Sequence, residues 1–192
     1  SRTGGASTNG YQSGGSSSFT EKSFAISFNF GFLSPTASIQ VKYVDPGSSN
    51  LNALKDLQAQ PGRFLSQHYA HPRNAVQELV VLALVKLASS DPDEAYKQMQ
   101  RTWSIHLTTE ERHWVWGAIG RQLAMRLDGD ALKAYEQARS DHDLTDDMLA
   151  WKVRAALRVG NTPAWKSVES AILAMDLPQR QEPVWVYWLG RA

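Results

Sequence analysis

A repeat of about 35 residues organises the C-terminal part of the chain. Three segments begin with alanine and an aromatic residue, namely Ala95-Tyr96-Lys97-Gln98, Ala134-Tyr135-Glu136-Gln137 and Ala164-Trp165-Lys166-Ser167. The pattern Trp-x-x-Arg-Ala starts at Trp151 and again at Trp188, which is 188 − 151 = 37 residues later. Two predicted helices per period indicate an α-solenoid, because one helix pair cannot bury its own apolar face and must stack on the next.

Start and stop signals delimit these helices. Asp91-Pro92-Asp93-Glu94 combines an N-cap carboxylate with a first-turn proline, and Thr108 has Glu111 three residues later, as in a capping box. Thr162-Pro163 repeats the cap-plus-proline signal, and Gly160-Asn161 is the predicted left-handed end of the helix before it. The predicted second helices cover residues 73–88, 109–127 and 146–159, and Gln181-Glu182-Pro183 opens the last one. We therefore expect an all-α superhelix of about four helical hairpins over residues 51–192.

The first 50 residues differ in character from the rest. Residues 1–18 are rich in Ser and Gly and predict a flexible segment, because they offer little apolar surface to bury. In residues 19–50, apolar side chains alternate with small or polar ones through Phe24, Ile26 and Phe28, and again through Ile39, Val41 and Tyr43. This period of two predicts a β-hairpin arm. Its origin stays open between a fused unit and an arm packed on the helices.

Composition excludes several classes of function. The net charge of the 192 residues is +1, so neither a nucleic-acid footprint nor a membrane-surface footprint is expected. Cysteine is absent, which excludes a disulfide framework and a thiolate catalyst. No apolar run reaches the ~18 residues of a membrane span, and the N-terminus lacks a signal-peptide pattern. No cofactor is expected.

The segment of residues 61–192 resembles the superhelical region of soluble lytic murein transglycosylases, whereas residues 1–50 resemble nothing that we recognise. The resemblance is carried by residues 87–96, by Trp114-Val115-Trp116-Gly117-Ala118-Ile119-Gly120-Arg121-Gln122, by residues 149–158 and by Trp185-Val186-Tyr187-Trp188. It implies a periplasmic, non-catalytic scaffold that contacts peptidoglycan or a catalytic domain absent from this chain. In that family a separate lysozyme-like domain cleaves the glycan strand with a single glutamate.

The chain itself presents no catalytic constellation at the sequence level. Glu169-Ser170 matches a dipeptide of the family's catalytic domain without the surrounding pattern, and we expect Glu169 to be a solvated helix position. His106, Glu110 and His113 do not have the spacing of a zinc motif, so no metal site is expected. The four aspartates at 141, 143, 146 and 147 lack the glycine and the closing glutamate of a calcium loop, and we expect them to cap helices.

Tryptophan supplies the binding candidates. All seven tryptophans lie at position 103 or beyond, and most fall at spacings that face a core. We single out Trp114 and Trp103 as candidates for stacking on sugar rings. Trp114 is the one expected at the surface, because Trp116 lies about 200° further round an ideal helix.

Two other functions remain as alternatives. A tetratricopeptide-like helical-repeat module would bind a protein partner, although its usual Trp-x-x-Leu-Gly spacing is interrupted by Val186. An intact enzyme using the cleft of the array is the third hypothesis.

Overall fold

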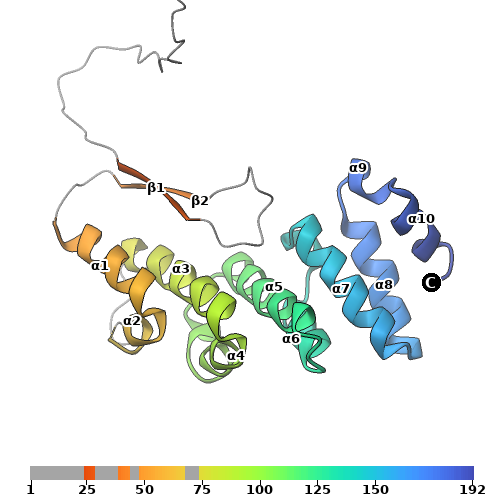
Figure 1. The fold of residues 1–192 in the computed structure, drawn as a ribbon, viewed down its shortest axis with the longest axis horizontal. Coiled ribbons are helices and arrows are strands. Elements are labelled where there is room, and N and C mark those ends of the chain that lie inside the picture. The colour runs from red at the N-terminus through yellow and green to blue at the C-terminus, as the bar shows by residue number, and fades with distance from the viewer. Residues whose placement is uncertain (1–23, 29–38, 44–47, 68–73) are drawn as a thin grey trace, which may run out of the picture.

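The computed structural model describes residues 24–28, 39–43, 48–67 and 74–192, and these residues are mostly helical, as the sequence predicts. Figure 1 shows the longer helices side by side, in chain order along the long axis of the molecule. The helical elements are α1 (Ser48–Ala59), α2 (Pro61–Gln67), α3 (Asn74–Ser90), α4 (Pro92–Arg101), η1 (Trp103–Ile105), α5 (Thr109–Met125), α6 (Ala131–Gln137), η2 (Asp141–Asp143), α7 (Asp146–Val159), α8 (Thr162–Ala174), α9 (Leu177–Arg180) and α10 (Pro183–Leu189).

Two strands precede the helices. The backbones of β1 (Phe24–Phe28) and β2 (Ile39–Tyr43) pair antiparallel, with Phe24 opposite Tyr43 and Phe28 opposite Ile39. The connection between the strands and the predicted flexible segment of residues 1–18 lie outside the described residues. The hairpin arm therefore stays a prediction.

Predicted caps define three helix ends. The Asp91 Oδ1 atom accepts the Glu94 N–H at 3.1 Å at the start of α4. Thr108 and Glu111 form a reciprocal capping box at the start of α5, with distances of 3.3 and 2.9 Å. Gly160 ends α7 in the left-handed conformation, with φ +66°. These local interactions satisfy N–H and C=O groups that a helix leaves unpaired at its ends.

Two boundaries differ from the prediction. Asn161, rather than Thr162, caps α8 by accepting the Ala164 N–H at 2.9 Å. Leu127, which the prediction placed inside the helix of residues 109–127, adopts the left-handed conformation just after α5, with φ +61°. There the Asp128 N–H reaches back to the Leu123 carbonyl at 2.9 Å, which is the bonding of a Schellman turn. The short helix α9 and the two 3₁₀ turns are additions that the apolar periodicity did not predict.

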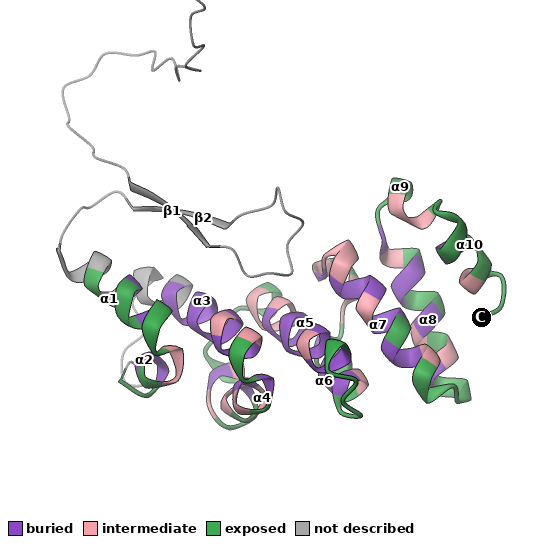
Figure 2. Ribbon diagram, in the orientation of Figure 1, coloured by how far each residue is buried: buried purple, intermediate pink, exposed green. Residues whose placement is uncertain are grey.

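Packing follows the order of the chain. The long helix α3 contacts α1, α2, α4 and α5, and α5 in turn contacts α3, α4, α6 and α7. Helix α7 packs on α5, α6 and α8, and α10 packs on α8. One apolar core runs through all of them, from Leu54 on α1 to Trp185 on α10. Figure 2 shows the buried residues concentrated along α3, α5 and α7, whereas α10 is largely exposed.

None of the described helices combines the length and the apolar character needed to cross a lipid bilayer.

Candidate binding site

The loop between α6 and α7 and the first turn of α7 connect several elements through four aspartates. The prediction that the four aspartates cap helices was wrong, because Thr145 caps α7 and the carboxylates reach other groups. One forms an ion pair with α5, one forms an ion pair with α7, one accepts a hydrogen bond from a histidine of α5, and one accepts a backbone N–H. The pairs are Asp143 with His113, Asp147 with Arg121, Asp141 with Lys152, and Asp146 with the N–H of Asp176.

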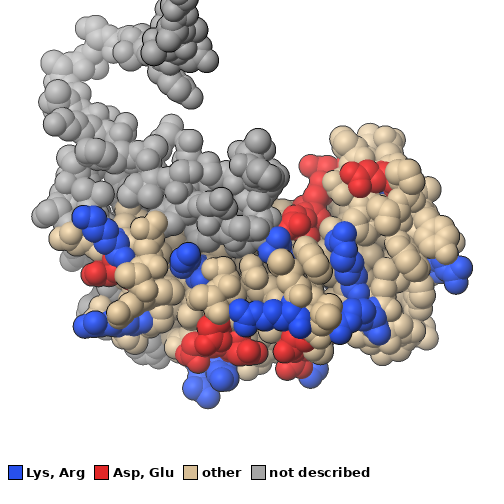
Figure 3. All heavy atoms as spheres, in the orientation of Figure 1, with Lys and Arg blue, Asp and Glu red and all other residues tan. Residues whose placement is uncertain are grey.

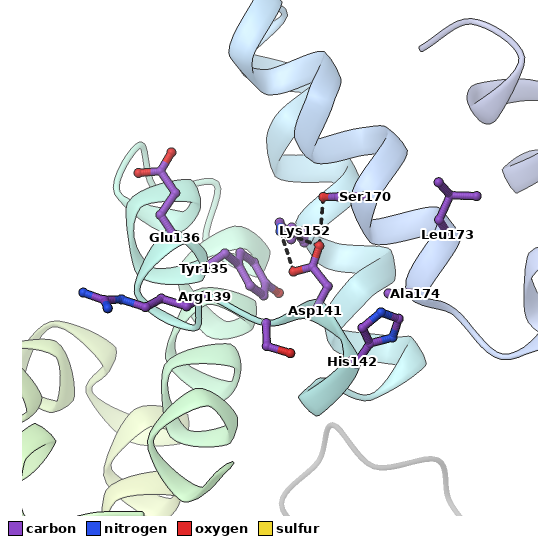
Figure 4. Close-up of a pocket in the computed structure, with 10 residues that line it drawn as sticks. Tyr135, Glu136, Arg139, Asp141, His142, Lys152, Ser170, Leu173 and Ala174 are labelled. Atoms are coloured by element: carbon purple, nitrogen blue, oxygen red, sulfur yellow. Dashed lines mark hydrogen bonds and ion pairs between the residues drawn. The ribbon is translucent and has the colours of Figure 1, made fainter. Parts of the chain in front are cut away.

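Asp141 forms the most enclosed of these interactions. The Lys152 Nζ atom donates to both of its carboxylate oxygens, at 2.6 and 2.8 Å. The side chains of Lys152 and Asp141 are 9% and 14% exposed, respectively. The Ser170 hydroxyl donates to the same carboxylate from α8, at 2.9 Å. One carboxylate thus joins η2, α7 and α8, as the dashed lines in Figure 4 show.

A cavity of about 590 Å³ opens beside this network. Its lining comes from α6, the loop with η2, α7 and α8. Leu173 and Ala174 provide an apolar wall. The charged and polar residues of the lining are Glu136, Arg139, Ser140, Asp141, His142, Lys152 and Ser170. A cavity of this size with both signs of charge can accommodate a small polar ligand or a side chain of a partner.

The buried Tyr135 side chain forms part of the wall of this cavity. The Tyr135 ring is 1% exposed, and its hydroxyl donates to the Met148 carbonyl at 2.8 Å. Burial raises the pKa of the Tyr135 phenol well above its ordinary value of 10.0, so the hydroxyl keeps the proton that it donates. This hydrogen bond joins α6 to α7.

The Asp141 carboxylate, which accepts the hydrogen bond of the Ser170 hydroxyl, determines what chemistry this hydroxyl can take part in. A nucleophilic serine needs a base that can take its proton. The Asp141 carboxylate already accepts two hydrogen bonds from an ammonium, and Lys152 is engaged with Asp141. The arrangement therefore joins helices and presents polar groups to the cavity.

A second, more open hollow lies around Trp114. It has a volume of about 360 Å³ and is lined by Trp114, Glu110, Glu111 and Asp143. Trp114 is half-buried, as are Trp151, Trp165 and Trp188, whereas Trp116 is 3% exposed. The predicted difference between Trp114 and Trp116 is present, but Trp114 is not the one tryptophan that reaches the surface. The hydrogen bond from His113, at 2.6 Å, lowers the pKa of the Asp143 carboxyl below its usual 3.8, which keeps it ionised.

Trp103 lies in a different environment. Its side chain belongs to the core, where it is 4% exposed, and its ring meets the His106 ring edge-on with centroids 6.1 Å apart. Trp114 is therefore partly exposed, whereas Trp103 is buried. The binding role of both residues remains a prediction. Glu169 is an exposed position of α8, as expected.

The sequence contains one signal for the Asp141–Lys152 pair besides the apolar periodicity. Lys152 interrupts the apolar face of α7 and lies next to Val153, which is fully buried. A charged residue at such a position requires a partner, because an unpaired buried charge is costly. The spacing to Asp141 crosses a loop, so the sequence alone does not identify which residue is the partner.

Among residues 74–192 and the other described parts, no three His, Asp or Glu side chains come close enough to hold a metal ion. Comparisons of the chain with protein-family models, curated proteins and solved structures gave no match.

Proposed function

We propose that the helical part of the chain is an α-solenoid that acts as a scaffold. Two arginines at the C-terminal ends of successive second helices support this arrangement. The Arg126 guanidinium, at the end of α5, donates to the Ser90 carbonyl at the end of α3, at 2.9 Å. The Arg158 guanidinium, at the end of α7, donates to the Leu127 carbonyl just after α5, also at 2.9 Å. Successive second helices are thus joined by the same kind of bond, which is expected of stacked units.

The proposed role of this scaffold is to hold a periplasmic lytic murein transglycosylase on peptidoglycan, while the bond cleavage takes place in a separate catalytic domain. The resemblance of residues 61–192 to the superhelical region of that family is the basis for the assignment. The position of Trp114 is the structural observation in its favour.

The Trp114 ring and the carboxylates around it match the two kinds of surface that a sugar ring presents. A pyranose ring has apolar C–H faces that pack on an aromatic ring, and hydroxyls that donate to carboxylates. The hollow supplies the half-buried Trp114 ring together with the carboxylates of Glu110, Glu111 and Asp143. Glu111 is fixed by the capping box, and Asp143 is fixed by His113. The acceptors are therefore positioned before a ligand arrives.

Sedimentation of the chain with purified peptidoglycan sacculi, together with titration by soluble glycan-strand fragments, tests this proposal. We expect Trp114→Ala to weaken binding about tenfold, which corresponds to the ~1.4 kcal/mol that one aromatic contact supplies. Trp114→Phe keeps a ring at the position and is the matched control. Undiminished binding by a folded Trp114→Ala chain would refute a sugar site at this hollow.

The cavity beside Asp141 favours a second candidate, a tetratricopeptide-like module for a protein partner. Glu136 and Arg139 at this cavity carry opposite charges that suit a polar peptide segment. Under this alternative, Arg139→Ala would weaken binding of the partner, and sacculi would not sediment the chain.

A further inference from the structure

The turn between α5 and α6 contains an aspartyl–glycyl bond. Asp128-Gly129 is the single Asp-Gly pair in the sequence. Both residues are exposed, and a Cβ atom added to Gly129 would have no atom within 4 Å. Figure 3 shows acidic and basic side chains close together at the surface over α6. Because glycine has no Cβ atom and this turn is open to solvent, the Gly129 nitrogen is sterically accessible to the side chain before it.

The Asp128 side chain turns back over the backbone that follows it. Its Oδ1 atom accepts the Asp130 N–H at 2.8 Å. An aspartate that bonds the N–H two residues further on brings its carboxyl group beside the peptide group in between. That peptide group is the bond between Asp128 and Gly129.

The Gly129 nitrogen itself takes no part in the hydrogen bonding of the turn. The Ala131 N–H donates to the Asp128 carbonyl at 3.4 Å, and Asp130 has φ −85° and ψ −1°. These values are those of a type I β-turn over residues 128–131, with Gly129 at its second position. Within the described part of the chain, the Gly129 N–H has no backbone acceptor. No hydrogen bond of the fold therefore has to break at this nitrogen before it reacts.

We propose that Asp128 is a site of spontaneous isomerisation to isoaspartate. The Gly129 nitrogen bonds to the Asp128 Cγ atom and gives up its proton, while Oδ2 of the neutral carboxyl leaves as water. Water then opens the cyclic imide at one of its two carbonyls, which returns aspartate or forms isoaspartate. The Asp130 N–H donates to Oδ1, the oxygen that gains negative charge as the nitrogen adds, and so stabilises that charge. The reaction consumes no co-reactant, because the water that is lost is regained.

Isoaspartate changes the connection from α5 to α6. The main chain then passes through the former side-chain carboxyl, so the hydrogen bonds that Asp130 and Ala131 donate to Asp128 lose their present geometry. The bond from the Asp128 N–H to the Leu123 carbonyl lies before the altered link and is kept. The modification therefore affects the start of α6 and leaves the end of α5 in place. This inference is independent of peptidoglycan binding.

Asp141 provides an internal reference for the reaction. It precedes His142, but its carboxylate accepts two hydrogen bonds from Lys152, at 2.6 and 2.8 Å, and one from Ser170, at 2.9 Å. These contacts hold the carboxylate on α7 and α8. We therefore expect Asp141 to remain unmodified while Asp128 reacts.

Incubation of the folded chain in water enriched in heavy oxygen, followed by trypsin digestion in ordinary water and mass spectrometry, tests the proposal. Cleavage after Arg126 and Lys133 gives a peptide of residues 127–133, and the peptide of residues 140–152 contains Asp141. We expect the first peptide to separate into two chromatographic forms, one of which has isoaspartate at position 128 by its fragment ions. That form should carry one heavy oxygen from the opening of the ring. The second peptide should stay a single form.

Gly129→Ala is the matched control, because its added Cβ atom meets open space in the fold but hinders the nitrogen. We expect it to slow the formation of isoaspartate at least about tenfold. A synthetic peptide of residues 127–133 gives the rate without the fold, and circular dichroism confirms that both chains are folded. Three outcomes would overturn the proposal: no isoaspartate at Asp128 in the folded chain while the free peptide converts, an equal rate in Gly129→Ala, and isoaspartate that forms during the incubation without heavy oxygen.

Discussion

Lys152 and Asp141 form an ion pair at the junction of α7, α8 and the loop before α7. The ammonium contacts both carboxylate oxygens, at 2.6 and 2.8 Å, while only 9% of the lysine side chain and 14% of the aspartate side chain are exposed. Two charges so far from water stabilise the fold only as long as each keeps its partner.

Replacing Asp141 with asparagine should lower the free energy of unfolding by about 3–5 kcal/mol, because it leaves a buried ammonium without a counter-charge. The double variant Asp141→Leu/Lys152→Met removes both charges and should recover most of the loss. Urea denaturation followed by circular dichroism measures both values. Equal midpoints for Asp141→Asn and the unaltered chain would show that the pair contributes nothing.

The Asp143 carboxyl should make stability depend on pH in the acid range. Its folded-state pKa lies below 3.8 because His113 donates a hydrogen bond to it. The folded state therefore binds this proton less readily than the unfolded state, so the contribution is complete above the unfolded value of 3.8. It is lost as the pH falls through the lowered folded value.

Thermal unfolding of the Asp143→Asn variant at a series of pH values checks this expectation. The variant should melt below the unaltered chain at pH 6, and the difference should shrink as the pH falls below 3.8. Asp93→Asn, an exposed change on α4, is the matched control. A difference in melting temperature that stays constant down to pH 2 would contradict the assignment.

Gly120 on α5 provides the close approach between α5 and α6. A Cβ atom at this position would lie 2.9 Å from the Tyr135 ring, which cannot move aside because it is buried and its hydroxyl bonds the Met148 carbonyl. We expect Gly120→Ala to cost about 1–2 kcal/mol, since overpacking exceeds the ~1 kcal/mol that alanine gains in helix propensity. Gly129→Ala has no atom within 4 Å of the added carbon and should change the unfolding midpoint little. Equal effects of the two changes would exclude a steric role for Gly120.

The sequence predicted those features of the fold that depend on neighbouring residues. Asp91, Thr108 and Gly160 act on groups within a few positions, so their capping roles follow from the local pattern. The periodicity also located α5 and α7, because apolar spacing reports directly on a helix face, although α5 ends at Met125 and not at residue 127 as predicted. The stacking of pairs is a non-local property that the repeat suggests without specifying which side chains meet.

The candidate sites were less predictable, because their partners come from different elements. Asp143 meets His113 from 30 positions earlier, and Ser170 meets Asp141 from 29 positions earlier. No local pattern specifies such pairs, and aspartates near a helix start resemble caps in sequence. Trp114 was accessible to prediction because its exposure follows from its angle relative to Trp116 on a single helix.

The two residues with left-handed backbones just after α5 and α7 predict stability changes of opposite sign. Leu127 has φ +61° and is 63% exposed, so it carries the steric strain of a side chain at this conformation without burying that side chain. Gly160 has φ +66° and avoids the strain. Leu127→Gly should therefore raise the free energy of unfolding by about 0.5–1 kcal/mol, and Gly160→Ala should lower it by about 1 kcal/mol.

Urea denaturation of the two single variants and of the double variant measures these effects. The Leu127 carbonyl belongs to the backbone, so glycine keeps the hydrogen bond that Arg158 donates to it. The two sites lie at the ends of different helices, so their effects should add in the double variant. Destabilisation by Leu127→Gly would mean that the leucine side chain supplies more contact energy than its backbone strain costs.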